Sequence, residues 1–249
     1  MNILEEKLLS AKKVAITGHV NPDGDCIGSV LAIYNYISTV YPEIKLSAYL
    51  EEFSDKFMFL KNSENIKQSV EEEIEFDLLI CVDSADIQRL GFSEVLLQKS
   101  KESINIDHHV SNTEHADYNY VEDVCSTAEL IYKFLEIFKI GLNKKIAEYI
   151  YLGIINDTGN FRHDNVTEKT FEICSKLIKA GVNNHKIANI LFSMSKEKSD
   201  LFGDVYENKV IDDKYGFIYY YLSEEKIKKL NVTKDDTDGI AEFLLKIED

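Results

Sequence analysis

Apolar and polar positions divide the chain into short apolar runs and longer segments with helical periodicity. The apolar runs, which we interpret as strands, cover residues 12–19, 44–50, 77–82 and 104–106. A first helix precedes them, and further helical segments cover residues 25–40, 130–140, 143–156 and 167–180. Runs that are apolar throughout are typical of parallel strands buried on both faces. The alternation therefore predicts an α/β fold with a doubly wound parallel sheet.

The pattern changes after residue 180. Residues 183–209 are helical in periodicity but polar, which is typical of a helix that connects two domains. An aromatic run over residues 215–222 predicts a strand, and short helical stretches follow it. We therefore expect a sheet domain over residues 1–190. Over residues 191–249 we expect a connecting helix and a partial second α/β domain.

Composition narrows the class of protein. The chain has 249 residues, of which 45% are hydrophobic, and this is enough for a sizeable core. Four cysteines without a CxxC pair fit reduced thiols, and no apolar run reaches the roughly 20 residues of a membrane span. We therefore expect a cytoplasmic protein. A net charge of −16 argues against binding of long duplex nucleic acid, but excess carboxylate can hold divalent cations for a small anionic substrate.

Polar clusters follow three of the predicted strands. His19, Asp23 and Asp25 follow the first strand, Asp83 follows the third, and the triplet 107–109 (Asp-His-His) follows the fourth. Taken singly, these clusters fit a turn, a helix cap or a solvated loop. Because the carboxyl ends of parallel strands meet in one crevice, their joint occurrence indicates a ligand site.

Asp157, at the end of a predicted helix, adds a further carboxylate to this set, although a turn residue would also fit there. A mixed shell of histidines and aspartates suits Mn²⁺ or Mg²⁺, and imidazole favours manganese or cobalt. We expect two divalent cations, with Mn²⁺ the leading choice and Mg²⁺ or Co²⁺ the alternatives.

The four clusters, in this order and spacing, resemble the four motifs of the DHH phosphoesterase superfamily, whose third motif is the Asp107-His108-His109 triplet. The form of residues 19–29 (HVNPDGDCIGS) is most similar to the bacterial branch of nanoRNases and phosphoadenosine-phosphate phosphatases. The resemblance covers roughly residues 10–245. It implies a manganese-dependent phosphodiesterase or phosphatase that hydrolyses short oligoribonucleotides, 3′-phosphoadenosine 5′-phosphate, or both.

The same resemblance assigns roles to the residues that match the motifs. One cation would be held by His19, Asp23 and Asp83. The other would be held by Asp25, Asp83, His108 and Asp157, which makes Asp83 the bridging carboxylate. His109 would lie beside the substrate phosphate and stabilise it or assist the leaving oxygen, and Asp107 would support the histidines.

The only two arginines, Arg89 and Arg162, both follow metal motifs. A guanidinium binds phosphate bidentately, so both are candidate substrate-binding residues. A surface salt bridge is an equally good interpretation for Arg89 and a weaker one for Arg162. We interpret Cys26 as a small core residue, and Gly28-Ser29 as the place where the first long helix approaches the sheet closely.

One feature departs from the family. Members usually carry a glycine-rich GGGH-type motif in a DHH-associated domain, and this sequence has none, so we expect either a truncated chain or a shortened variant. Alternative functions are a linear di-adenylate phosphodiesterase, a pyrophosphatase, or, in another class, a non-catalytic nucleotide-binding sensor. The expected partner is a small nucleotide or short oligonucleotide, with no membrane; a homodimer is left open.

Overall fold

The computed structural model describes residues 3–137 and 142–247, which divide into two compact units, Met1–Leu191 and Phe192–Asp249. Residues 138–140 of the predicted helix 130–140 lie outside the described residues. The strands of the first unit are β1 (Lys13–Thr17), β2 (Lys45–Tyr49), β3 (Phe76–Val82), β4 (Ser100–Asp107) and β5 (Tyr118–Val121). Its α-helices are α1 (Ile3–Ser10), α2 (Gly24–Val40), α3 (Val95–Gln98), α4 (Thr127–Ile137), α5 (Lys144–Asp157), α6 (Glu168–Lys179) and α7 (Asn184–Phe192). Short 3-10 helices are η1 (Asp55–Phe57), η2 (Ser63–Asn65) and η3 (Ile87–Glu94).

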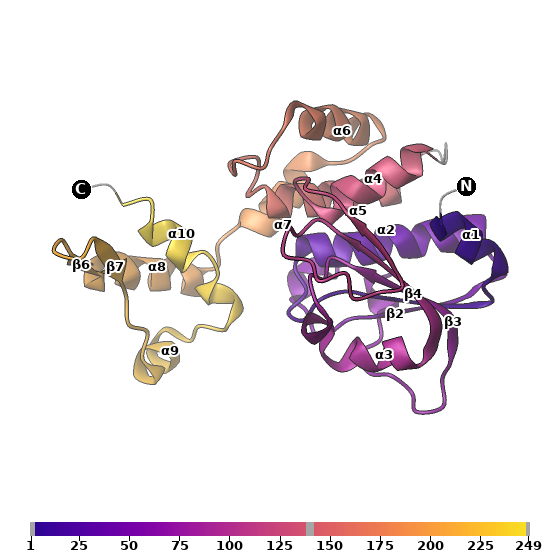
Figure 1. Ribbon diagram of the computed structural model, residues 1–249. Helices are drawn as coiled ribbons and strands as arrows, with labels where there is room; N and C mark the ends of the chain where they lie inside the picture. Colours follow the sequence, from indigo (N-terminus) through magenta and orange to yellow (C-terminus); the bar gives the residue numbers. More distant parts are fainter. Residues whose placement is uncertain (1–2, 138–141, 248–249) are drawn as a thin grey trace. The chain divides into compact units, whose positions relative to one another are not determined.

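The first unit (Figure 1) is built on one parallel sheet, and pairing of its strands gives the order β2-β1-β3-β4-β5. The predicted α/β class with a doubly wound parallel sheet is confirmed. After β1 the chain moves to one side of the sheet to form β2, and then crosses to the other side to form β3. The strand order therefore reverses between β1 and β3, and this is the position where open α/β sheets bind their ligands.

Both faces of the sheet are buried, which explains why its central strands are apolar throughout. In β1, Val14 and Ile16 belong to the large core that includes residues of α2, α4 and α5, while Ala15 belongs to a smaller core on the opposite face. Leu90 of η3 and Leu96 of α3 line the smaller core. The face of the sheet with the large core is thus covered by long helices, and the face with the smaller core by short ones.

Helix α2 approaches helix α5 more closely than the sequence analysis anticipated. A β carbon built on Gly28 would lie 2.4 Å from the backbone oxygen of Tyr149 in α5. Gly28 therefore permits a close approach between two helices, and the prediction that it serves the contact with the sheet is wrong. The reason is that residue 28 lies on the side of α2 that faces α5.

Three predictions about individual elements need correction. The helical segment 183–209 is two helices, α7 and α8 (Lys196–Asn208), because Ser195 caps a new helix by accepting a hydrogen bond from the Lys198 N–H at 2.9 Å. The predicted strand 215–222 is shorter, since only β7 (Phe217–Tyr219) pairs, with β6 (Val210–Asp212). Strand β5 was missed because its residues are half-buried and do not form an apolar run.

The second unit has its own small core. Helix α8 supplies Leu201 and Val205, which pack with Val232 and with Leu244 of α10 (Ile240–Leu244). The antiparallel pair β6–β7, helix α9 (Glu224–Leu230) and the short η4 (Asp235–Thr237) complete it. Across the described residues of both units, we find no helix that combines the length and the apolar character needed to cross a membrane.

The contact of α2 with α5 generates a prediction. Gly28→Ala would place a methyl group against a backbone oxygen that cannot rotate away, so the two helices must separate. We expect the free energy of unfolding to fall by about 1–3 kcal/mol, as for overpacked cores. Urea denaturation followed by circular dichroism measures this change.

Gly203→Ala is the control, because Gly203 is also helical but a β carbon there meets nothing within 4 Å. Alanine at an open helical position should be neutral or stabilise by about 0.5–1 kcal/mol. Unchanged stability of Gly28→Ala would contradict the role of the close approach.

Candidate metal centre

The loop after β1 places the first group of candidate ligands. His19 lies two residues beyond the end of β1 and is buried. Asp23 caps helix α2, because its Oδ1 accepts hydrogen bonds from the backbone N–H of Asp25 at 3.0 Å and of Cys26 at 3.1 Å. Nε2 of His19 lies 3.7 Å from Oδ1 of Asp23. The turn and cap interpretations of this cluster are therefore compatible with a role as ligands.

Asp83 follows β3 in an unusual backbone conformation. Its φ is 56°, in the left-handed region, where a non-glycine residue costs about 1–2 kcal/mol although aspartate is tolerated better than most. The carboxylate is buried, and Oδ1 accepts a hydrogen bond from the Thr127 hydroxyl at 3.1 Å. Strain of this kind persists where the surrounding structure enforces it, and it is frequent at functional sites.

The Asp83 carboxylate lies between two histidines. Its Oδ2 is 3.3 Å from Nε2 of His19, and its Oδ1 is 3.7 Å from Nε2 of His108. The two oxygens therefore face histidines that come from loops after different strands. This is the arrangement that a carboxylate shared by two cations requires.

Hydrogen bonds to backbone carbonyls fix how both histidines present their second nitrogen. Nδ1 of His19 donates to the Val20 carbonyl at 2.7 Å, and Nδ1 of His108 donates to the Val124 carbonyl at 3.1 Å. In each ring Nε2 is thereby left to accept, as a metal ligand must. Nε2 of His108 is buried and makes no hydrogen bond within the described part of the chain. This buried nitrogen and the carboxylates around it fit a divalent cation.

A further group brings together Asp25, His108 and Asp157. Their ligand atoms all lie within 4.8 Å of one another, and Oδ2 of Asp157 is 3.2 Å from Nε2 of His108. Asp25, in the first turn of α2, is completely buried. Its carboxylate lies at the N-terminus of α4, where it accepts hydrogen bonds from the backbone N–H of Thr127 at 2.7 Å and of Ala128 at 2.9 Å. The positive end of the helix dipole stabilises this carboxylate.

Burial and neighbouring charges strongly shift the pKa values of the carboxylates and histidines in this site. Burial, together with the carboxylates of Asp83 and Asp157, raises the pKa of Asp25 well above its ordinary range. Burial by itself lowers the pKa of His19, but the Asp23 and Asp83 carboxylates outweigh it and raise this pKa to about 10. His108 behaves in the same way, and its pKa is raised to about 9 by Asp157 and Asp83. Without cations, protons therefore neutralise the carboxylates.

His109 and Asp107, the histidine predicted to lie beside the substrate and the carboxylate predicted to support it, adjoin this site. Asp107 is completely buried, and its Oδ1 accepts a hydrogen bond from Nδ1 of His109 at 2.7 Å. The Asn112 amide donates to its Oδ2 at 2.6 Å. Burial raises the pKa of Asp107, but His109 and Asn112 outweigh burial and lower it. His109 is less buried than the other two histidines, and its Nδ1 lies 3.8 Å from Oδ1 of Asp83.

The two arginines are exposed. The backbone oxygen of Arg89 accepts the Val20 N–H at 2.6 Å, which places this residue next to the loop that carries His19. Nε of Arg162 donates to the Gly159 carbonyl at 2.7 Å, in the loop that follows Asp157. Neither arginine forms a salt bridge with a described residue. Their role in substrate binding stays a prediction.

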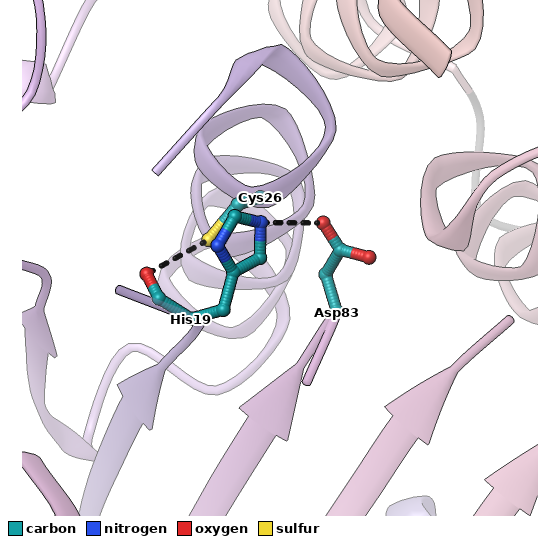
Figure 2. A group of neighbouring side chains, drawn as sticks. All are labelled: His19, Cys26 and Asp83. Carbon is teal, nitrogen blue, oxygen red and sulfur yellow. Dashed lines mark hydrogen bonds and ion pairs between the residues drawn. The ribbon is translucent and has the colours of Figure 1, made fainter. Parts of the chain in front are cut away.

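The sequence analysis missed three contributors to the site. Thr127 binds Asp83, and the signal for it was the capping-box spacing of residues 126–129, which marks a helix N-terminus. Asn112 orients Asp107, but no sequence signal distinguishes it from other loop asparagines. Cys26, interpreted as a core residue, is buried, yet its sulfur also lies within 4.8 Å of ligand atoms of His19 and Asp83 (Figure 2).

The fold and site together define an α/β protein with a cation-binding crevice of histidines and aspartates at the carboxyl ends of its strands. The profile described as "DHH family, N-terminal domain" matches residues 13–154. The chain belongs to the DHH family, and the predicted resemblance is confirmed.

Named relatives agree with the expected branch of the family. "Probable bifunctional oligoribonuclease and PAP phosphatase NrnA" of Streptococcus mutans serotype c is 29% identical over 245 residues, which cover 97% of this chain and 76% of the relative. "Bifunctional oligoribonuclease and PAP phosphatase NrnA" of Bacillus subtilis is 28% identical over 228 residues, which cover 90% of this chain and 70% of the relative. A solved structure of an exopolyphosphatase-related protein from Bacteroides fragilis matches with a TM-score of 0.90 and 24% identity, over 99% of this chain and 76% of that chain. At this identity the match shows the shared fold.

The raised histidine pKa values predict a pH dependence of metal binding. A cation that takes Nε2 of His19 or His108 displaces a proton, because the pKa values are about 10 and about 9 in the metal-free chain. Between about pH 6 and pH 8, affinity should therefore rise by up to about tenfold per pH unit for each displaced proton. Calorimetric titration with Mn²⁺ at several pH values measures this slope.

His19→Gln should reduce the slope, because glutamine carries no proton to displace. His185→Gln is the matched control, since His185 is exposed on α7 and hydrogen-bonds Asn189 at 3.1 Å. The stability of the metal-free fold changes with pH in the opposite direction to the Mn²⁺ affinity, because it falls as the pH rises. The ion pairs of His19 stabilise it fully below its ordinary pKa of 6.5, and that contribution is lost as the pH rises through about 10. A pH-independent affinity would contradict the assignment.

Proposed function

We propose that this chain is a two-metal phosphoesterase that hydrolyses short oligoribonucleotides and 3′-phosphoadenosine 5′-phosphate. The observation that carries the proposal is the position of Asp83, whose two oxygens face His19 and His108. The substrates are inferred from relatives named as oligoribonucleases and PAP phosphatases, which align with most of the chain.

The ligand sets are those that the family resemblance implies, and the separations of Asp83 from His19 and His108 support them. His19, Asp23 and Asp83 hold one cation. Asp25, Asp83, His108 and Asp157 hold the other. The mixture of imidazole and carboxylate ligands favours Mn²⁺ over Mg²⁺, with Co²⁺ as an alternative.

When bound by these residues, two divalent cations would activate a water at neutral pH and neutralise charge on the phosphate oxygens. The protein residues hold and orient the reacting groups. Asp107 keeps the proton of His109 on Nδ1 or, when the ring is doubly protonated, stabilises its charge. Because Asp107 raises the pKa of His109, the ring is a good hydrogen-bond donor to a phosphate oxygen or to the leaving oxygen.

Arg89 and Arg162 complete the proposal as substrate-binding residues. Arg89, in η3, and Arg162, in the loop after α5, both adjoin segments that carry candidate ligands, and both guanidinium groups are free of carboxylate partners among the described residues. A guanidinium can therefore meet the phosphates of a nucleotide directly. The second unit is proposed to be part of a DHH-associated domain. Action in the cytoplasm and formation of a homodimer stay predictions.

Asp83→Asn tests the bridging role. Asparagine tolerates the left-handed backbone and keeps the size of the side chain, but it lacks the charge that two cations share. We expect hydrolysis to fall about a thousandfold or more, which corresponds to several kcal/mol of lost stabilisation of the transition state. Mn²⁺ content after dialysis, and turnover of 3′-phosphoadenosine 5′-phosphate and of a trinucleotide, are the measurements.

Asp164→Asn, at an exposed position, is the control for a lost surface charge and should keep both properties. An Asp83→Asn protein that still binds two Mn²⁺ ions with unchanged affinity would show that the ligand sets are wrong. A wild-type chain that binds Mn²⁺ but hydrolyses neither substrate would favour the sensor alternative.

Alanine variants of His109 and His108 should distinguish a role in catalysis from a role in metal binding. His109→Ala removes the proposed phosphate donor but none of the proposed ligands, so the Mn²⁺ content should persist while turnover falls by about 10²–10⁴-fold, the range of general acid–base contributions. His108→Ala should lose Mn²⁺ as well as turnover. Equal loss of Mn²⁺ from the two variants would make His109 a ligand.

A further inference from the structure

The first metal position contains a sulfur atom. Cys26 lies in the first turn of α2 and is completely buried. Its Sγ lies within 4.8 Å of a ring nitrogen of His19 and of a carboxylate oxygen of Asp83, and these two atoms are as close to each other (Figure 2). Donor atoms around one first-row cation lie at most about two bond lengths apart, roughly 4–5 Å. The three side chains therefore meet the geometric requirement for sharing an ion.

The neighbouring chain leaves room for this sulfur. A β carbon built on Gly18 would lie 2.3 Å from Sγ of Cys26, so any larger residue at position 18 would push the sulfur away. The thiol faces the carbonyl oxygen of His19 at 4.0 Å, which is a weak hydrogen bond. Among the described residues, Sγ thus has a poor hydrogen-bond partner.

The surroundings of Cys26 differ from those of Cys81, which is also buried. The sulfur of Cys26 lies among the ligand atoms of His19 and Asp83. By contrast, Cys81, a residue of β3, lies in an apolar core. The Cys26 sulfur is thus a soft donor placed among hard carboxylate donors.

We propose that Cys26 is an additional thiolate ligand at the cation position of His19 and Asp83, and that this sulfur shifts the preference of the position from Mn²⁺, which the imidazole and carboxylate ligands alone favour, towards a zinc-class ion, Zn²⁺ or Co²⁺. Sulfur, imidazole and carboxylate together are typical of zinc sites, whereas Mn²⁺ and Mg²⁺ prefer oxygen. On binding, the S–H bond breaks, the proton passes to solvent and the sulfur lone pair binds the cation, with no change of oxidation state. The inference rests on the proposed function for the location of the cation site.

Co²⁺ is the probe for the sulfur ligand. The metal-stripped full chain is titrated with Co²⁺, and the thiolate-to-cobalt charge-transfer absorption in the near ultraviolet is recorded together with the visible bands that report bound Co²⁺ itself. We expect the wild type to show the charge-transfer absorption, saturating at one ion per chain. Cys26→Ser should lose it, and its affinity for Zn²⁺ should fall at least about tenfold in a chelator competition.

Cys174→Ala is the control, because Cys174 is a buried cysteine of α6 outside the metal groups formed by the described residues. It should keep the absorption. Cys26→Ala is a second variant for the case that serine disturbs folding, which circular dichroism monitors. Because the wild-type spectrum is decisive by itself, the test does not depend on either variant folding.

Visible bands without charge-transfer absorption would show that Co²⁺ binds through other ligands, and this would overturn the role of Cys26. Charge-transfer absorption that survives in Cys26→Ser would overturn it as well. Hydrolysis by the same preparations with Mn²⁺ is measured in parallel. Mn²⁺-dependent turnover without a sulfur signal refutes only the inference about Cys26, whereas absence of turnover with every cation refutes the proposed function.

Discussion

The structure depends on the mutual repulsion of carboxylates that converge at one edge of the sheet. Asp25 and Asp83 are buried there. Besides burial, Asp23 and Asp157 raise the pKa of Asp25, and Asp23 also raises the pKa of Asp157. Charges of the same sign at such distances destabilise a fold unless something of opposite sign lies between them. Protonated histidines provide part of this positive charge, and divalent cations, when bound, would provide the rest. The metal-free fold is thus destabilised at this edge of the sheet by repulsion between its carboxylates.

The protein holds these groups in place with its backbone. The first turn of α4 donates two N–H groups to Asp25, and the first turn of α2 donates two to Asp23. Both helices pack against α5, which ends at Asp157. Gly153 of α5 makes this possible, because a β carbon there would lie 2.3 Å from an oxygen of Asp25. The candidate ligands therefore belong to one rigid assembly of helix ends and strand ends.

The sequence predicted the parts of this assembly that depend on local patterns. Apolar runs located four strands, and the polar residues that follow them located His19, Asp83 and His108. Contacts between distant segments could not be predicted, because nothing near residue 28 indicates the oxygen of Tyr149 and nothing near Asp25 indicates Thr127. The break before Ser195 was missed since helical periodicity continues across it. Cys26 was interpreted by its residue type alone, while its role depends on its neighbours.

The left-handed backbone of Asp83 has a consequence for how this family can change. At this position a glycine would relieve the strain, but it would also remove the carboxylate that pairs with His19 and His108. These two effects oppose each other, so a lineage that no longer used metal chemistry would gain stability from a change at residue 83 only if the two histidines were replaced as well. Among divergent copies of this chain, substitutions at residues 19, 83 and 108 should therefore occur together, as expected for residues whose contributions to stability are coupled.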